Sequence, residues 1–282
     1  MTAPVIVGVD GGASAEDALV FGRWAADTLA APLVVAVVHP APSALGSGRV
    51  DAEWVADRHR AAEAVLDQAR AMLGAHGGDV TYRVVASSSA AHGLHDLAEE
   101  TGAALIVIGA GHERSRLGST AERLLSGSVC PVAVTPTDLP PPTGLIGVAY
   151  VDTPDGRAAL GEAAKFASRL GARLRLYTVV ATGDAAKPFL IGQDAERAFL
   201  ETARETYERS LQAAADSVPA CDADWRILPG DVVDTLADLD EVDVLFCGSR
   251  GYGPARRVLL GGVSARLIRR ARRPVVVVPR SG

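Results

Sequence analysis

The chain contains one sequence pattern twice, and this internal repeat constrains its fold more than any other feature. The stretch "VGVDGGASAEDALVFGRWAADTLAAPLVVAVVH" near the start returns in altered form as "VAYVDTPDGRAALGEAAKFASRLGARLRLYTVV". Further along, "AALIVIGAG" returns as "VDVLFCGSRG", which sets Gly109 against Gly248. Two similar units therefore fill the 282 residues, and we expect domains over residues 1–138 and 143–282. The proline-rich segment 135–144, "TPTDLPPPTG", is typical of a stiff linker between them.

Within each unit, short apolar runs alternate with longer stretches of helical periodicity, which is the pattern of strand–helix–strand folds. Nearly continuous Val and Ile runs such as "PVIVGV" favour strands covered on both faces, as in a parallel sheet. Ser14 followed by Asp17, and Thr153 followed by Pro154, are typical of helix starts. Each unit is therefore predicted to be a doubly wound α/β domain with a five-stranded, mainly parallel sheet. The strands expected in the first unit are 5–9, 33–38, 80–85, 105–108 and 132–135, and the expected helices are 15–30, 52–73, 91–100 and 119–125.

The composition excludes several classes of protein. A net charge of −6 argues against nonspecific binding to nucleic acid or to an acidic membrane surface. The three cysteines lie far apart without a CxxC pair, so we expect neither a zinc knuckle nor a disulfide framework. The start "MTAPVIVGVDGG" has no basic leader, and no apolar run reaches membrane-spanning length. We therefore expect a soluble, cytoplasmic protein with no membrane or nucleic-acid partner.

Ligands of open parallel sheets bind beyond the carboxyl ends of the strands, and both units place polar residues and glycines there. Asp10 and Asp152 follow the first strand of the two units. The loop after the fourth strand of the second unit reads Gly248-x2-Gly251-x9-Gly261-Gly262-Val263-Ser264. Glycines let a backbone approach a ligand closely, and the free N–H groups of a helix start suit phosphate. The residues alone leave two interpretations open: a phosphate-binding loop, or a tight turn from a strand into a helix.

Other candidate sites have weaker patterns. His92 and His95, with Asp96, have a spacing at which two imidazoles share one face of a helix, but the cluster lacks a further ligand nearby. Solvated or capping histidines are the favoured interpretation, and no metal is expected. The segment 269–274, "RRARRP", favours a solvated helix end over an RNA contact, because cations suit that end of a helix. No strained G-x-S-x-G turn accompanies the serines of "SSSAAHGLHD", so we expect no catalytic residue there.

Both units resemble universal stress protein domains, and the whole chain resembles the tandem, two-domain members of that family. The resemblance rests on "VGVDG", on "PGDVVDTLADLDEVDVLFCGSRG" and on the terminal "GGVSARLIRRARRPVVVVP". It implies a Rossmann-like fold of the adenine nucleotide alpha hydrolase type, with strand order 3-2-1-4-5. It also implies ATP, with or without Mg²⁺, bound by the pattern G-x2-G-x9-G-[ST]. Asp152 would then contact the ribose or adenine, and the main chain near Val179 would meet the base.

The implied site residues depart from the family pattern in each unit. Gly262 stands where the family has Ser or Thr, although Ser264 lies two residues on. The loop between Gly109 and Gly118 is four residues shorter than its counterpart in the second unit. The implied nucleotide-binding residues are Asp152, Val179, Gly248, Gly251, Gly261, Gly262, Val263 and Ser264 in the second unit, and Asp10, Val37, Gly109, Gly118, Ser119 and Thr120 in the first.

The leading hypothesis is an ATP-binding, stress-linked regulator or sensor with little or no turnover, because no residue set resembles a general base for a γ-phosphate. The alternative is an interaction scaffold of the same fold that has lost its nucleotide. A third hypothesis, an adenylate-forming or pyrophosphatase-type enzyme, requires a Ser-Gly-Gly-x-Asp-Ser loop that "DGGASAED" lacks. The apolar last strands, "CPVAVTP" and "RPVVVVPR", are edge strands that need a partner. We expect them to pair within the chain as a pseudo-dimer, and the chain has the potential to form a homodimer.

Overall fold

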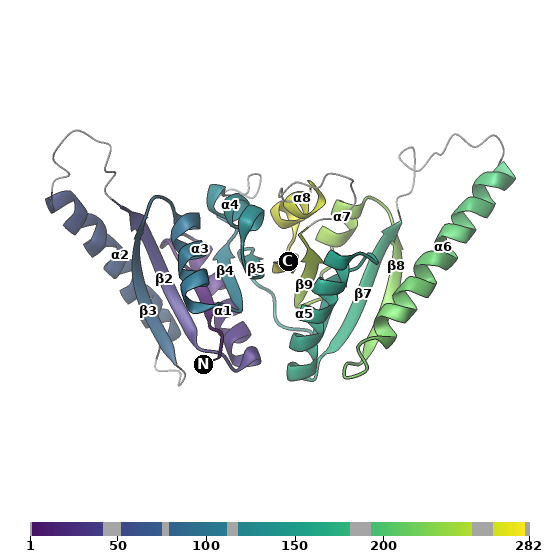
Figure 1. Ribbon diagram of the computed structural model, residues 1–282, viewed down its shortest axis with the longest axis horizontal. Coiled ribbons are helices and arrows are strands. Elements are labelled where there is room, and N and C mark those ends of the chain that lie inside the picture. The colour runs from purple at the N-terminus through teal and green to yellow at the C-terminus, as the bar shows by residue number, and fades with distance from the viewer. Residues whose placement is uncertain are drawn as a thin grey trace. The chain divides into compact units, whose positions relative to one another are not determined.

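The computed structural model describes most of the chain, namely residues 2–41, 52–74, 79–111, 118–180, 193–249 and 262–279 (Figure 1). The chain forms two compact units, and the boundary between them lies between Leu139 and Pro140. No helix in the described ranges has both the length and the apolar character needed to cross a bilayer.

The first unit is a five-stranded parallel sheet with strand order β3-β2-β1-β4-β5. This order reverses direction at β1, which lies between β2 and β4, as expected for a doubly wound domain. The elements are β1 (Val5–Gly8), α1 (Ala15–Leu29), β2 (Leu33–Pro40), α2 (Ala52–Leu73), β3 (Val80–Ser87), α3 (Ala90–Thr101), β4 (Leu105–Gly109), α4 (Ser119–Gly127) and β5 (Val132–Thr135). The predicted fold class is confirmed, and the predicted bounds are right to within two residues.

The second unit repeats the same topology, with strand order β10-β9-β6-β7-β8 and parallel pairing. Its elements are β6 (Leu145–Ala149), α5 (Pro154–Leu170), β7 (Arg173–Val180), α6 (Gln193–Asp216), β8 (Ala223–Pro229), α7 (Val232–Ala237), β9 (Val244–Gly248), α8 (Gly262–Arg270) and β10 (Val275–Val278). The internal sequence repeat is therefore a repeat of the whole α/β topology.

Helices cover both faces of each sheet. Because strand–helix–strand connections are right-handed, α1 and α2 cover one face of the first sheet and α3 and α4 cover the other. The contacts of α1 with α2, and of α3 with α4, agree with this arrangement (Figure 1). In the second unit α7 packs against α8 in the same way. The carboxyl ends of the central strands remain uncovered by these helices and are the place where a ligand can enter.

The cores consist of aliphatic side chains from the central strands. Val5, Ile6 and Val7 of β1 have no exposed surface, and neither have Ile146 and Val148 of β6. Full burial of such a side chain stabilises the fold by about 1.5–3 kcal/mol. Burial on both faces explains why these strands read as continuous apolar runs instead of alternating patterns.

The two predicted helix starts differ in the structure. Thr153 caps α5 as predicted, because its hydroxyl accepts a hydrogen bond from the Gly156 N–H at 3.1 Å. Ser14 precedes α1 but its side chain makes no capping hydrogen bond, so the predicted capping box is wrong. Asp17 instead accepts from the backbone N–H groups of Asp138 and Leu139, at 3.2 and 3.1 Å. The carboxylate that the local pattern assigned to the helix cap therefore accepts hydrogen bonds from a backbone segment that is distant in the sequence.

Candidate functional site

The first unit has a cavity at the carboxyl end of its sheet, with about 670 Å³ of space including its open mouth. It lies where the polar loops were predicted to converge. Three segments supply most of its lining: the end of β1, the turn after β4 and the first turn of α4. The residues they contribute are Gly8, Val9, Asp10, Ile108, Gly109, Ala110, Gly111, Gly118, Thr120 and Ala121.

The loop after β4 is short in the first unit, yet the residues at both of its ends line one cavity. Gly109 and Gly111 on one side of the loop, and Gly118 and Thr120 on the other, all line the same cavity. Residues 112–117 between them lie outside the described part of the chain. The loss of four loop residues is therefore compatible with the convergence that a phosphate site requires.

The polar groups of the first cavity include a carboxylate and a helix start, beside the hydroxyls of Ser14 and Thr120. Asp10 is exposed, and its Oδ1 accepts a hydrogen bond from the Gly12 N–H at 2.8 Å, which fixes its orientation. Gly118 is the N-cap of α4 and provides no side chain to satisfy the first N–H groups of the helix. No atom of the described residues would lie within 4 Å of a Cβ at Gly118, so that part of the chain leaves space in front of this helix end. Such an end favours an anion.

The glycines that end β4 and β9 have a packing role. A Cβ at Gly109 would lie 2.1 Å from the Ser14 Oγ and 2.9 Å from the Ser14 carbonyl oxygen. A Cβ at Gly248 would lie 2.8 Å from the Cβ of Asp155 and 2.9 Å from its carbonyl oxygen. The interpretation that Gly248 clears space for a ligand therefore needs correction, because the first turn of α5 fills that space. In both units this glycine lets the strand end approach the start of a helix.

The second unit has a cavity at the equivalent edge, with about 520 Å³ of space including its mouth. Of the sequence-predicted residues it brings together Val179, Gly248, Val263 and Ser264. Asp152 and Gly262 are described but do not line it. Gly251 and Gly261 lie outside the described residues, as does most of the loop to which they belong.

Ser264 does not offer its hydroxyl to this cavity as a donor. The side chain is buried, and its Oγ donates a hydrogen bond to the Gly248 carbonyl oxygen at 3.2 Å. A hydroxyl carries a single proton, so it cannot donate to a phosphate oxygen while this bond holds. The group of Ser264 that remains to donate to a phosphate, in place of the missing Ser or Thr hydroxyl, is therefore its backbone N–H.

Asp152 is engaged by side chains of its own unit. It accepts a hydrogen bond from the Tyr150 hydroxyl at 3.3 Å and forms an ion pair with Arg157. Burial, followed by the negative charge of Asp152, raises the pKa of Tyr150 to about 12, so this phenol stays protonated and donates. Asp10 has no comparable basic partner among the described residues, and it lines the cavity of its own unit. The two aspartates occupy matching sequence positions but have different surroundings.

Val37 and Ser119 complete the predicted set. Val37 is buried within β2, and the cavity is lined instead by its neighbours Ala36 and Val38. Ser119 is the first residue of α4. Sequence reasoning missed Tyr150, which lines the second cavity and orients Asp152. Its position two residues before Asp152, just beyond the end of β6 at the ligand edge of the sheet, was the available signal.

Several side chains that line the two cavities are polar or ionisable. Cys247 lines the second cavity, but burial raises the pKa of its thiol to about 12, so the thiolate nucleophile is scarce at neutral pH. The first cavity offers the hydroxyls of Ser14 and Thr120 and the carboxylate of Asp10.

Comparisons with known proteins agree with this architecture. The model of the universal stress protein family matches the chain twice, over residues 1–136 and 144–279. Universal stress protein Rv2319c of Mycobacterium tuberculosis is 31% identical over 254 residues, which span 85% of this chain and 86% of that protein. The crystal structure of a universal stress protein from Archaeoglobus fulgidus is 20% identical, covers 100% of this chain and 97% of its own, and superposes with a TM-score of 0.68.

A second Archaeoglobus fulgidus universal stress protein, solved in complex with dAMP, covers 48% of this chain and 98% of its own, at 28% identity and a TM-score of 0.38. The dAMP complex is a finding about that Archaeoglobus fulgidus protein. The two family matches and the tuberculosis relative, which together span both halves, decide the classification. The chain belongs to the universal stress protein family and carries two copies of the family's domain.

Proposed function

We propose that this protein is an adenine-nucleotide-binding regulator, with ATP, alone or with Mg²⁺, as the ligand and with little or no turnover. The observation that carries the proposal is the lining of the first cavity, where Asp10, Gly109–Gly111 and the start of α4 meet. These are a carboxylate suited to a ribose hydroxyl and a helix start suited to phosphate.

The phosphate end of the proposed site is the first turn of α4. Its N-cap is Gly118, so the N–H groups of the turn have no capping side chain, and Thr120 adds a hydroxyl to the lining. Charge-assisted hydrogen bonds to such groups contribute about 1.5–3 kcal/mol each. Loss of one or two of them would weaken binding by about tenfold or more.

The first unit is the stronger of the two proposed sites. In the second unit Asp152 is paired with Arg157, and the Ser264 hydroxyl donates to Gly248. A ligand there would have to compete with both interactions. In the first unit the matching Asp10 lines the cavity without a basic partner in the described chain. We expect the first unit to bind nucleotide more tightly.

A calorimetric titration of the full chain with ATP, ADP and AMP tests the proposal. A carboxylate introduced at the helix start repels phosphate, so Gly118→Glu should abolish the tighter binding event. Gly262→Glu puts the same carboxylate in the first turn of α8 in the second unit and should leave that event intact. At both positions no atom of the described residues lies within 4 Å of an added Cβ, so both variants should keep the fold. If the wild type binds none of the three nucleotides, the proposal is wrong.

The second candidate function is an interaction scaffold that binds no nucleotide. The internal pairing of Asp152 and the Ser264 hydroxyl favours it for the second unit, because these groups are already satisfied without a ligand. The pairing of the last strands within the chain, and a homodimer, belong to either function and stay predictions. Light scattering on the purified chain gives the oligomeric state, and nucleotide-independent capture of one defined partner would favour the scaffold.

A further inference from the structure

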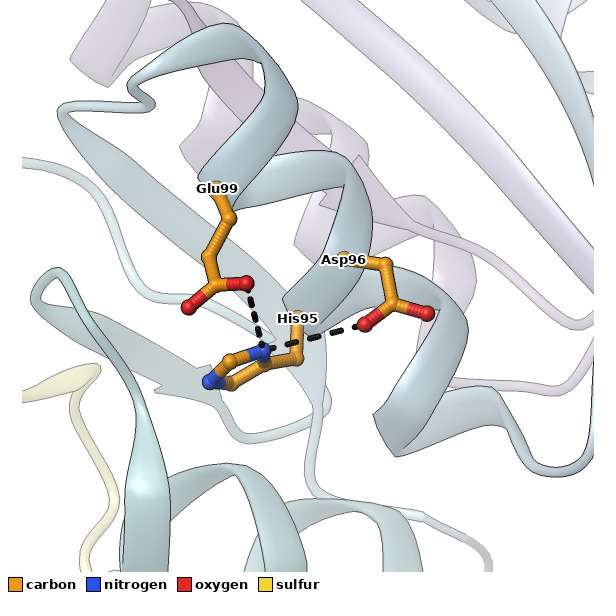
Figure 2. Close-up of side chains that lie close together, drawn as sticks. All are labelled: His95, Asp96 and Glu99. Atoms are coloured by element: carbon orange, nitrogen blue, oxygen red, sulfur yellow. Dashed lines mark ion pairs between the residues drawn. The ribbon is translucent and has the colours of Figure 1, made fainter.

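Figure 2 shows three possible metal ligands that lie close together on α3, and none of the three lines the first cavity. The Nδ1 of His95 lies 4.0 Å from a carboxylate oxygen of Asp96 and 3.9 Å from one of Glu99. One atom from each of the three side chains can be chosen so that all lie within 4.8 Å of one another. At these distances the ring and the carboxylates are too far apart to share a hydrogen bond.

The other ring nitrogen determines which tautomer His95 adopts. Its Nε2 lies 3.0 Å from the carbonyl oxygen of Gly127, the last residue of α4. A carbonyl can only accept, so Nε2 carries the proton and donates it. In the neutral ring Nδ1 then has a lone pair, and this lone pair faces two carboxylates (Figure 2). Three electron-rich groups this close together repel one another, and a cation bound between them removes that repulsion.

The second unit shows what fills this place in the sister domain. By the sequence repeat, His95 corresponds to Asp234 and Gly127 corresponds to Arg270. Arg270 forms an ion pair with Asp234, so a guanidinium from α8 neutralises the acidic group on α7. In the first unit Gly127 has no side chain, and no atom of the described residues would lie within 4 Å of an added Cβ there. The imidazole of His95 stands at the position of Asp234 and contacts the Gly127 carbonyl, so the first unit has no counterpart of the Arg270 guanidinium at this helix end.

No nearby basic side chain takes over that role within the described ranges. The guanidinium of Arg83 pairs with Glu100, the neighbour of Glu99. The side chains that the structure places against Asp96 are His92 and His95, at 3.9 and 4.0 Å. Among the described residues, the ion-pair partners of the two carboxylates are therefore the imidazoles of His92 and His95.

We propose that His95, Asp96 and Glu99 bind a divalent transition-metal ion of the zinc type. The Nδ1 of His95 and one oxygen from each carboxylate are the protein ligands, and water completes the coordination. Zinc binds imidazole nitrogen and carboxylate oxygen at about 2.0–2.2 Å, so half-buried His95 and the exposed carboxylates of Asp96 and Glu99 must move closer together to share one ion. The bond from Nε2–H to the Gly127 carbonyl is the outer contact that metal-bound histidines ordinarily make. The site links α3 to the end of α4 and does not depend on nucleotide.

Zinc binding is tested on the full, untagged chain after treatment with a chelator and dialysis, without nucleotide. Calorimetric titration with ZnCl₂ should give one saturable site, and zinc should raise the melting temperature of the wild type. His95→Ala and Glu99→Gln should weaken binding by about tenfold or more. His59→Ala is the matched control, because His59 and Glu63 have the same i, i+4 spacing without a second carboxylate. This control should bind zinc like the wild type.

The comparison with the second unit gives a further variant. Gly127→Arg restores the guanidinium at the position where the sister domain has one, in open space and at a helix end that favours cations. It should abolish zinc binding and keep or raise the melting temperature measured without zinc. The proposal is overturned if the wild type shows no saturable zinc binding. It is equally overturned if folded His95→Ala protein binds zinc as tightly as the wild type.

Discussion

A methyl group added at Gly248 should destabilise the second unit through a clash with α5. The Cβ of Gly248→Ala would lie 2.8 Å from the Asp155 Cβ and 2.9 Å from the Asp155 carbonyl carbon and oxygen. Ordinary contacts begin at 3.4 Å, and the facing atoms belong mainly to backbone, which cannot rotate away. The end of β9 or the first turn of α5 must therefore move.

The magnitude follows from two opposing effects. Insertion of a methyl group into a packed site costs about 1–3 kcal/mol. Replacement of glycine by alanine also restricts the unfolded chain, which stabilises by about 0.4–1 kcal/mol. With mid-range values of about 2 and about 0.7 kcal/mol, the net loss of unfolding free energy is about 1.3 kcal/mol, which lowers the melting temperature by about 3–5 °C for a chain of this size.

Thermal unfolding followed by circular dichroism measures this loss, and Gly262→Ala is the control in the same unit. Gly262 is the first residue of α8, and its Cβ would meet no atom of the described residues within 4 Å. Alanine is favoured over glycine in helices by about 0.5–1 kcal/mol, so this variant should be at least as stable as the wild type. A Gly248→Ala protein that melts like the wild type, but binds nucleotide more weakly, would refute the packing role and restore the ligand role.

Two further predictions concern ionisable groups. Asp224 accepts hydrogen bonds from the buried Arg175 guanidinium, which holds the pKa of the carboxyl below its ordinary value of 3.8 in the folded state. This ion pair stabilises the fold above pH 3.8, and its contribution is lost as the pH falls through the lower folded pKa of Asp224. In Arg175→Met the free energy of unfolding should therefore depend less on pH below 3.8, which acid unfolding curves measure. Burial raises the pKa of the Cys130 and Cys247 thiols to about 11 and about 12, whereas Cys221 is partly exposed. Iodoacetamide at neutral pH should therefore label Cys221 first in the folded protein, and peptide mapping that finds Cys247 labelled first would contradict this.

The internal repeat and the apolar runs determined the architecture from the sequence alone. Burial of a parallel strand on both faces requires a continuous run such as "PVIVGV", and an amphipathic helix requires its own period. Both signals are local, so the predicted ends of β2 and α4 each differ from the structure by two residues. The cavities could also be placed at the carboxyl edge of each sheet, because the topology dictates that edge.

The partner of each polar group was decided only by the tertiary structure. Asp17 meets the backbone of Asp138, and the Ser264 hydroxyl meets the Gly248 carbonyl, over long distances along the chain. Sequence reasoning expected solvated or capping histidines at positions 92 and 95, but it could not identify the Gly127 carbonyl that orients the His95 ring. A hydrogen bond depends on a few tenths of an ångström and on the direction of a lone pair. Those quantities are set when helices and strands distant in sequence pack together, and no local pattern encodes them.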